Sequence, residues 1–103
     1  MSENQTRVVA LEGEIDLSTA PEAERRIAEA EDAEPERLIV DLRAVTFMDS
    51  SGLRILLTAH RRAEEQGRGF ALITGGDAVE RLLSVTGLAG RIEVLPGSAA
   101  ADG

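Results

Sequence analysis

Residues 37–53 of this chain, RLIVDLRAVTFMDSSGL, decide how it folds. The run 37–42 is apolar almost throughout, which is typical of a central strand covered on at least one face. Residues 51–66 then carry leucines at helical spacing, and Gly67 is placed to end that helix. A buried strand followed by an amphipathic helix predicts a β–α unit. We expect Val45, Phe47 and Met48, which lie between the two elements, to close over the core.

The rest of the chain repeats this alternation. Residues 7–12, 68–74 and 91–95 have the composition of strands, and residues 14–17 are expected to add a short one. Two further helices are predicted, one capped by Thr19 and one capped by Asp77 and ended by Gly87. Alternating strands and helices predict an α/β fold with a small, mixed but mostly parallel sheet. Because such crossovers are right-handed, we expect the helices to lie mainly on one face.

Length and charge set the class of protein. The chain has 103 residues, which suits one domain, with residues 7–95 predicted as the folded part and 1–6 and 96–103 as flexible ends. Its 11 basic residues, all arginine, are outweighed by 19 acidic ones, which gives a net charge of −8. That charge repels phosphate backbones, and two phenylalanines make no stacking platform, so no nucleic acid partner is expected.

The composition also excludes most catalytic chemistry. The chain has no cysteine for thiolate chemistry and no lysine for a phosphate-binding loop. His60 lies about nine or ten residues along the helix from Ser50 and Ser51, roughly 14 Å away, so it cannot be their general base. We expect it to pack with the leucines instead. The sequence thus predicts no catalytic residue, no cofactor and no metal centre, although a loose carboxylate site for magnesium stays open.

No apolar run approaches the roughly 20 residues that span a bilayer, and the first six residues are polar rather than signal-like. We therefore expect a soluble, cytoplasmic protein without a membrane partner.

The polar junction before the central helix is the feature most suggestive of function. In open α/β sheets, function gathers where strand carboxyl ends meet helix amino ends. Asp49, Ser50 and Ser51 can each accept a hydrogen bond from a first-turn amide, so one of them should cap the helix. Gly52 would allow close backbone packing. From the residues alone, a well-capped helix explains the pattern as well as a binding site does.

Three separated segments carry a resemblance. TFMDSSGLRILL after LIVDLRAV, with GEIDLSTA upstream and VERLLSVTGL downstream, closely resembles the STAS domains of bacterial anti-sigma factor antagonists over about residues 7–95. The resemblance implies a cytoplasmic anti-anti-sigma factor with a small sheet and about four helices. It implies that an anti-sigma factor, itself a serine kinase, phosphorylates Ser50, and that a serine phosphatase reverses this. It also implies that Asp16 helps to contact the kinase.

Around Ser50 we expect the partner to contact Asp49, Ser51, Gly52 and Ile55. Ile55 is expected to face away from the buried stripe that contains Leu53. Three alternatives remain open: Asp16 as a solvated loop residue, a non-switching structural STAS module in a larger signalling or transport assembly, and a nucleotide-binding domain.

Overall fold

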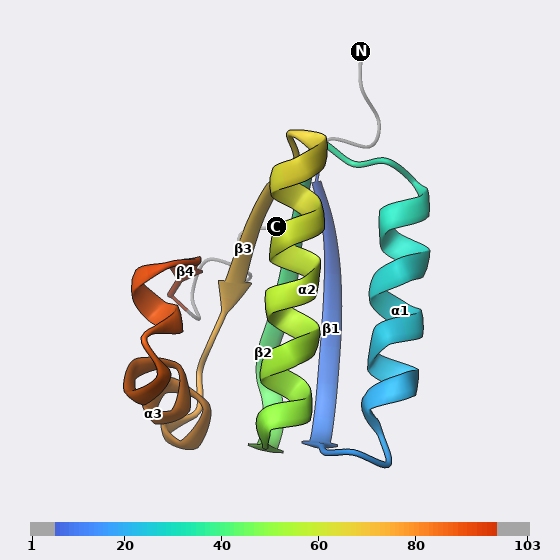
Figure 1. Ribbon diagram of the computed structural model, residues 1–103. Helices are drawn as coiled ribbons and strands as arrows, with labels where there is room; N and C mark the ends of the chain where they lie inside the picture. Colours follow the sequence, from blue (N-terminus) through green and yellow to red (C-terminus); the bar gives the residue numbers. More distant parts are fainter. Residues whose placement is uncertain (1–5, 97–103) are drawn as a thin grey trace.

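The computed structural model describes residues 6–96 (Figure 1). The expected flexible ends lie almost wholly outside these residues, although Thr6 already belongs to the first strand. Within residues 6–96, no helix is long and apolar enough to cross a membrane. The elements follow in the order β1 (Thr6–Ile15), α1 (Ala20–Asp32), β2 (Arg37–Met48), α2 (Ser50–Gln66), β3 (Gly69–Ile73), α3 (Asp77–Thr86), the 3₁₀ turn η1 (Leu88–Gly90) and β4 (Glu93–Leu95).

The four strands form one sheet in chain order, β1-β2-β3-β4, and every pairing is parallel. The α/β prediction of a small, mostly parallel sheet is confirmed, and within residues 6–96 the sheet contains no antiparallel pair. Each right-handed crossover moves one strand further in the same direction, so the connecting helices lie on the same face. Figure 1 shows α2 crossing in front of β1 and β2. Over the described residues there are three α-helices and η1, rather than about four helices.

β1 differs most from its prediction. The short separate strand expected at residues 14–17 is absent, because β1 continues to Ile15 through two shifts of register. Gly13, at a φ of 72°, permits the second irregularity. β2 also runs on to Met48, and its Phe47 pairs with Glu14. Ile15 and Met48 point into the core. Because side chains alternate along a strand, Glu14 and Phe47, which precede them, point to the opposite face. Phe47 is therefore 49% exposed and does not close over the core as expected.

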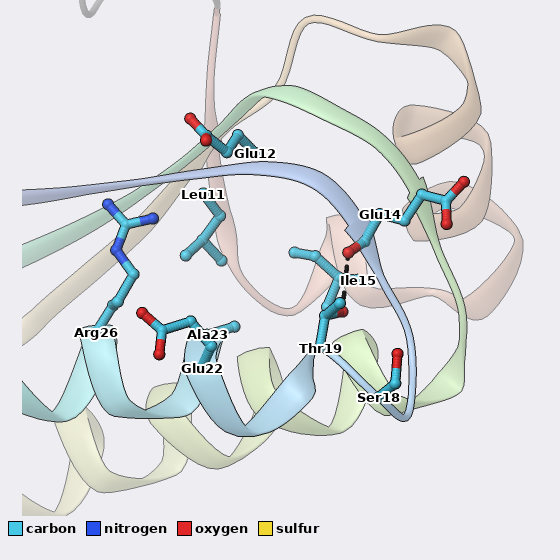
Figure 2. Close-up of a pocket in the computed structure, with 9 residues that line it drawn as sticks. All are labelled: Leu11, Glu12, Glu14, Ile15, Ser18, Thr19, Glu22, Ala23 and Arg26. Carbon is cyan, nitrogen blue, oxygen red and sulfur yellow. Dashed lines mark hydrogen bonds between the residues drawn. The ribbon is translucent and has the colours of Figure 1, made fainter.

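Thr19 occupies the N-cap position of α1 as predicted, but its side chain does not cap the helix, and the cap predicted at Asp77 is wrong. The Thr19 hydroxyl donates to the Glu14 carbonyl at 2.8 Å (Figure 2). It also accepts from the Asp16 amide at 2.9 Å, and it makes no cap hydrogen bond to α1. Gly76, not Asp77, is the residue before α3. Glu80, in the first turn of α3, accepts a hydrogen bond from the Thr74 hydroxyl at 2.9 Å. Gly67 and Gly87 end α2 and α3 in the left-handed conformation, as expected.

The main core lies between the sheet and its helices. Alternate residues of β2, Leu38, Val40 and Leu42, are fully buried against this layer. The residues between them face the other side, where Ile39 joins Ala71 and Ile73 in a smaller apolar cluster. The division follows from the period of two in a strand, which sends successive side chains to opposite faces.

A cluster of charged side chains connects α1, α2 and the start of β3 at the amino end of the sheet. Glu31 at the end of α1 accepts from Arg62 of α2, with 3.0 Å between Oε1 and Nη2. Its Oε2 lies 3.7 Å from Nη1 of Arg68, which leads into β3. The Arg68 side chain is only 6% exposed, and its Nε and Nη1 make no hydrogen bond within the described residues. Glu31 therefore supplies the nearby negative charge that compensates a buried cation.

Removing that charge should destabilise the fold. We expect Glu31→Gln to lower the free energy of unfolding by about 2–3 kcal/mol, because Arg68 would stay buried without its counter-ion. Glu29→Gln is the matched control, since Glu29 is 64% exposed in its pair with Arg25, and its loss should cost less than about 0.5 kcal/mol. Urea denaturation measures both values. Equal losses in the two variants would contradict the role given to Glu31.

Candidate functional site

The junction between β2 and α2 is built around Asp49. Its backbone is extended, and its side chain accepts a hydrogen bond from the Ser51 amide at 2.8 Å. The Asp49 carbonyl accepts from the amides of Gly52 and Leu53, which starts the helical pattern. Of the three side chains that could cap α2, the structure thus selects Asp49. The hydroxyls of Ser50 and Ser51 therefore do not cap the helix.

Ser50 is the first residue of α2 and is exposed, whereas Ser51 is half-buried. Within residues 6–96, the Ser50 hydroxyl makes no hydrogen bond, so the fold does not require it. Its place at the amino end of a 17-residue helix puts it where the helix dipole favours negative charge.

A second strand end is tied to this junction. The Asp49 amide donates to the carbonyl of Ile15, the last residue of β1, at 3.2 Å. Gly52 packs against the same place, since a Cβ built on it would lie 2.3 Å from Cγ of Met48 and 3.2 Å from Cγ2 of Ile15. Asp16 follows Ile15 directly. The structure therefore brings Asp16, Asp49, Ser50, Ser51 and Gly52 to one end of the sheet.

Asp16 organises the loop between β1 and α1. Its Oδ1 accepts from the hydroxyl and amide of Ser18, at 2.8 and 2.9 Å, and from the amide of Thr19 at 3.1 Å. These hydrogen bonds, the Ser18 hydroxyl foremost, hold the pKa of Asp16 below its ordinary value. The carboxylate is therefore ionised at neutral pH, and it is more than a solvated loop residue.

The exposure expected for Ile55 is wrong. Ile55 is only 5% exposed, while Leu53 is half-buried at the flank of the core. The buried face of α2 consists of Gly52, Ile55, Leu56, Ala59 and Ala63. Ile55 belongs to the core and leaves the set of expected contact residues.

Two exposed apolar side chains near this end were missed from the sequence. Leu17, next to Asp16, is 80% exposed, and Phe47, two residues before Asp49, is 49% exposed. A leucine between Asp16 and Ser18 in a polar loop was a visible signal. Phe47 carried none, because its orientation depends on the two register shifts, at each of which β2 has one residue more than β1.

His60 packs as expected and takes no part in the site. It is half-buried on α2, with its ring centroid 5.7 Å from that of Phe70. Among residues 6–96, no group of three or more histidine or carboxylate side chains is arranged to hold a metal ion.

Comparison with known proteins places these features in context. A family model described as the STAS domain matches residues 2–101. The chain is 34% identical over 85 residues to the anti-sigma-F factor antagonist RsfB of Mycobacterium tuberculosis, a match that covers 82% of this chain and 69% of RsfB. The crystal structure of an anti-sigma factor antagonist from Mycobacterium paratuberculosis is similar with a TM-score of 0.82 and 33% identity, covering 91% of this chain and 80% of that one.

The fold is shared with SpoIIAA, an anti-sigma factor antagonist solved in two forms. The unphosphorylated form has a TM-score of 0.76 at 24% identity, covering 99% of this chain and 90% of SpoIIAA. The phosphorylated form, from Bacillus, has a TM-score of 0.70 at 23% identity, covering 99% and 93%.

The close packing at Gly52 is open to test. Alanine favours a helix over glycine by about 1 kcal/mol, yet we expect Gly52→Ala to lower the free energy of unfolding by about 1–3 kcal/mol, because the added methyl overlaps Met48. Gly90→Ala is the control, since its Cβ would meet nothing within 4 Å. Chemical denaturation compares the two. A Gly52→Ala protein as stable as the parent would contradict the contact.

Proposed function

This chain belongs to the STAS domain family, and from that premise we propose that it is an anti-sigma factor antagonist that binds an anti-sigma serine kinase and is switched off by phosphorylation of Ser50. Similarity to RsfB and to the paratuberculosis antagonist supports the antagonist function. The single observation that carries the proposed switch is the exposed Ser50 hydroxyl, which is free of hydrogen bonds within the described residues and stands at the start of α2.

The position of Ser50 suits reversible phosphorylation. The helix dipole and first-turn amides favour an anion at this place by about 0.3–1 kcal/mol. Since Asp49 already caps the helix, modification of Ser50 removes no hydrogen bond within the described residues. We therefore expect the phosphorylated chain to keep its fold. That SpoIIAA, which shares this fold, exists in a phosphorylated form is in keeping with this expectation.

The partner kinase supplies the catalytic groups for phosphoryl transfer. Ser50 Oγ would attack the γ-phosphorus of ATP held by the kinase, so that the Oγ–P bond forms, the bond to the β–γ bridging oxygen breaks and ADP leaves. The hydroxyl proton passes to a base of the kinase. A serine phosphatase reverses the step by hydrolysing the ester to serine and inorganic phosphate. This chain acts as substrate and binding module, not as enzyme.

Phosphorylation would change binding through charge and bulk. It adds about −1.5 to −2 charges at neutral pH, beside the carboxylate of Asp49 on a chain that already carries −8. The partner surface that binds Ser50 must then accept a dianion in place of a neutral hydroxyl. A hundredfold loss of affinity requires only about 2.7 kcal/mol of discrimination.

The site assignment can be tested with the purified anti-sigma kinase and ATP. Ser50→Ala should remain unphosphorylated and bind the kinase with parental affinity, whereas Ser50→Asp should bind at least tenfold more weakly. Ser51→Ala is the matched control, and should be phosphorylated like the parent chain. Mass spectrometry locates the phosphate, and calorimetry measures binding. Phosphate on Thr58 or Ser84, or on no residue, would refute the switch.

Asp16 should contribute to binding separately from its role in the loop. In Asp16→Asn, the amide oxygen can still accept from the amides of Ser18 and Thr19, so we expect little change in melting temperature. Loss of the negative charge should still weaken kinase binding. Calorimetry and thermal denaturation on the same protein separate the two effects. A large fall in melting temperature with unchanged affinity would show that Asp16 is structural only.

A further inference from the structure

We propose that Leu17 enters an apolar pocket of the anti-sigma kinase and anchors this chain there while Ser50 is phosphorylated. The inference rests on the proposed function, because it assigns a further binding residue to the same partner. Three observations support it: the exposure of Leu17, the hydrogen bonds that fix its loop, and the place of that loop beside Ser50.

Leu17 is the most exposed large apolar side chain of residues 6–96, at 80%. The others that are exposed are Val8, Phe47 and Val85. Single exposed apolar side chains are common on protein surfaces and indicate nothing by themselves. Phe47, however, pairs with Glu14 near the end of β1, so two of these four side chains lie at the end of the sheet that carries the polar junction. Apolar side chains beside polar ones are the usual composition of a binding surface.

Hydrogen bonds on both sides of Leu17 fix the loop that carries it. The Asp16 carboxylate accepts from Ser18 and Thr19, and the Asp16 carbonyl also accepts from the Thr19 amide, at 3.1 Å. The Thr19 hydroxyl joins the loop to β1 through the Glu14 carbonyl (Figure 2). The backbone around Leu17 is therefore ordered before any partner arrives. A partner can bury the leucine without the entropic cost of ordering the loop.

This loop lies beside the proposed phosphorylation site. Ile15 and Met48 are neighbours in the parallel pairing of β1 with β2. Leu17 and Ser50 each follow two residues later, and Figure 1 shows the loop after β1 and the start of α2 at the same end of the sheet. Neighbouring strands are about 4.8 Å apart, whereas a specific interface covers about 800 Å² of each partner. A kinase that reaches Ser50 therefore meets this loop as well.

The two neighbouring residues of the loop would contribute by different physical effects. Leu17 has no polar side-chain atom, so its contribution to binding is the burial of apolar surface. Asp16 is ionised, so its contribution is electrostatic and is screened by salt. The dependence of binding on salt concentration can therefore separate an apolar contact at Leu17 from a change in the Asp16 carboxylate.

Calorimetry with the purified kinase tests the contact. We expect Leu17→Ala to weaken kinase binding at least tenfold, and Leu17→Met to restore most of the affinity, because methionine keeps the apolar volume. The loss in Leu17→Ala should be as large at about 500 mM salt as at about 50 mM, whereas the loss in Asp16→Asn should shrink. Val8→Ala is the matched control, since Val8 is exposed at the amino end of β1, and it should bind like the parent chain.

Phosphorylation kinetics give an independent measurement. Leu17 does not touch the transferred phosphoryl group, so Leu17→Ala should raise KM for this chain and leave kcat unchanged. Its melting temperature should stay that of the parent chain, because the side chain is almost fully exposed.

Failure of this inference is distinct from failure of the proposed function. If the parent chain is phosphorylated on Ser50 but Leu17→Ala binds as tightly as the parent, or no more weakly than Val8→Ala, only the inference is overturned. It is also overturned if Leu17→Ala keeps its kinase affinity and instead abolishes self-association in sedimentation equilibrium, since a second copy would then cover Leu17. A parent chain that neither binds the kinase nor accepts phosphate would overturn both.

Discussion

The hydrogen bond from the Asp49 amide to the Ile15 carbonyl is the constraint on which the functional end of this molecule depends. It joins the end of β1 to the start of α2, two segments more than thirty positions apart in the chain. Gly52 allows that approach, because any larger side chain would meet Met48 and Ile15. Through this contact, the loop of Asp16 and the hydroxyl of Ser50 share one end of the sheet.

Much of this arrangement could be predicted from local patterns. The apolar run of β2, the helix that follows it and the stop at Gly67 are all set by neighbouring residues. The continuity of β1 could not be predicted, because it depends on pairing with β2 across the register shifts. The same shifts decide that Phe47 faces outward, so no pattern within its own strand indicated its exposure.

The error over α2 has a different cause. The spacing predicts a buried stripe of Leu53, Leu56, Leu57 and Ala63. Leu56 and Ala63 are buried as predicted, whereas Leu53 and Leu57 are half-buried and the buried face also includes Gly52, Ile55 and Ala59. Small residues let a helix lie close to a sheet, so they mark the contact better than large ones here. Of the site, the polar junction and Asp16 were visible in sequence, whereas the choice of Asp49 as the cap required the backbone geometry.

The order of the strands has a consequence for what this architecture can sense. Enzymes built on doubly wound sheets hold nucleotides at a switch point, where the strand order reverses and neighbouring connections diverge to opposite faces. Over residues 6–96 the order never reverses. To acquire such a crevice, the domain would need one crossover to run the other way, which would lay a helix across the face where Ile39, Ala71 and Ile73 now cluster. The described sheet therefore has no switch-point crevice of the kind that holds a nucleotide in doubly wound folds.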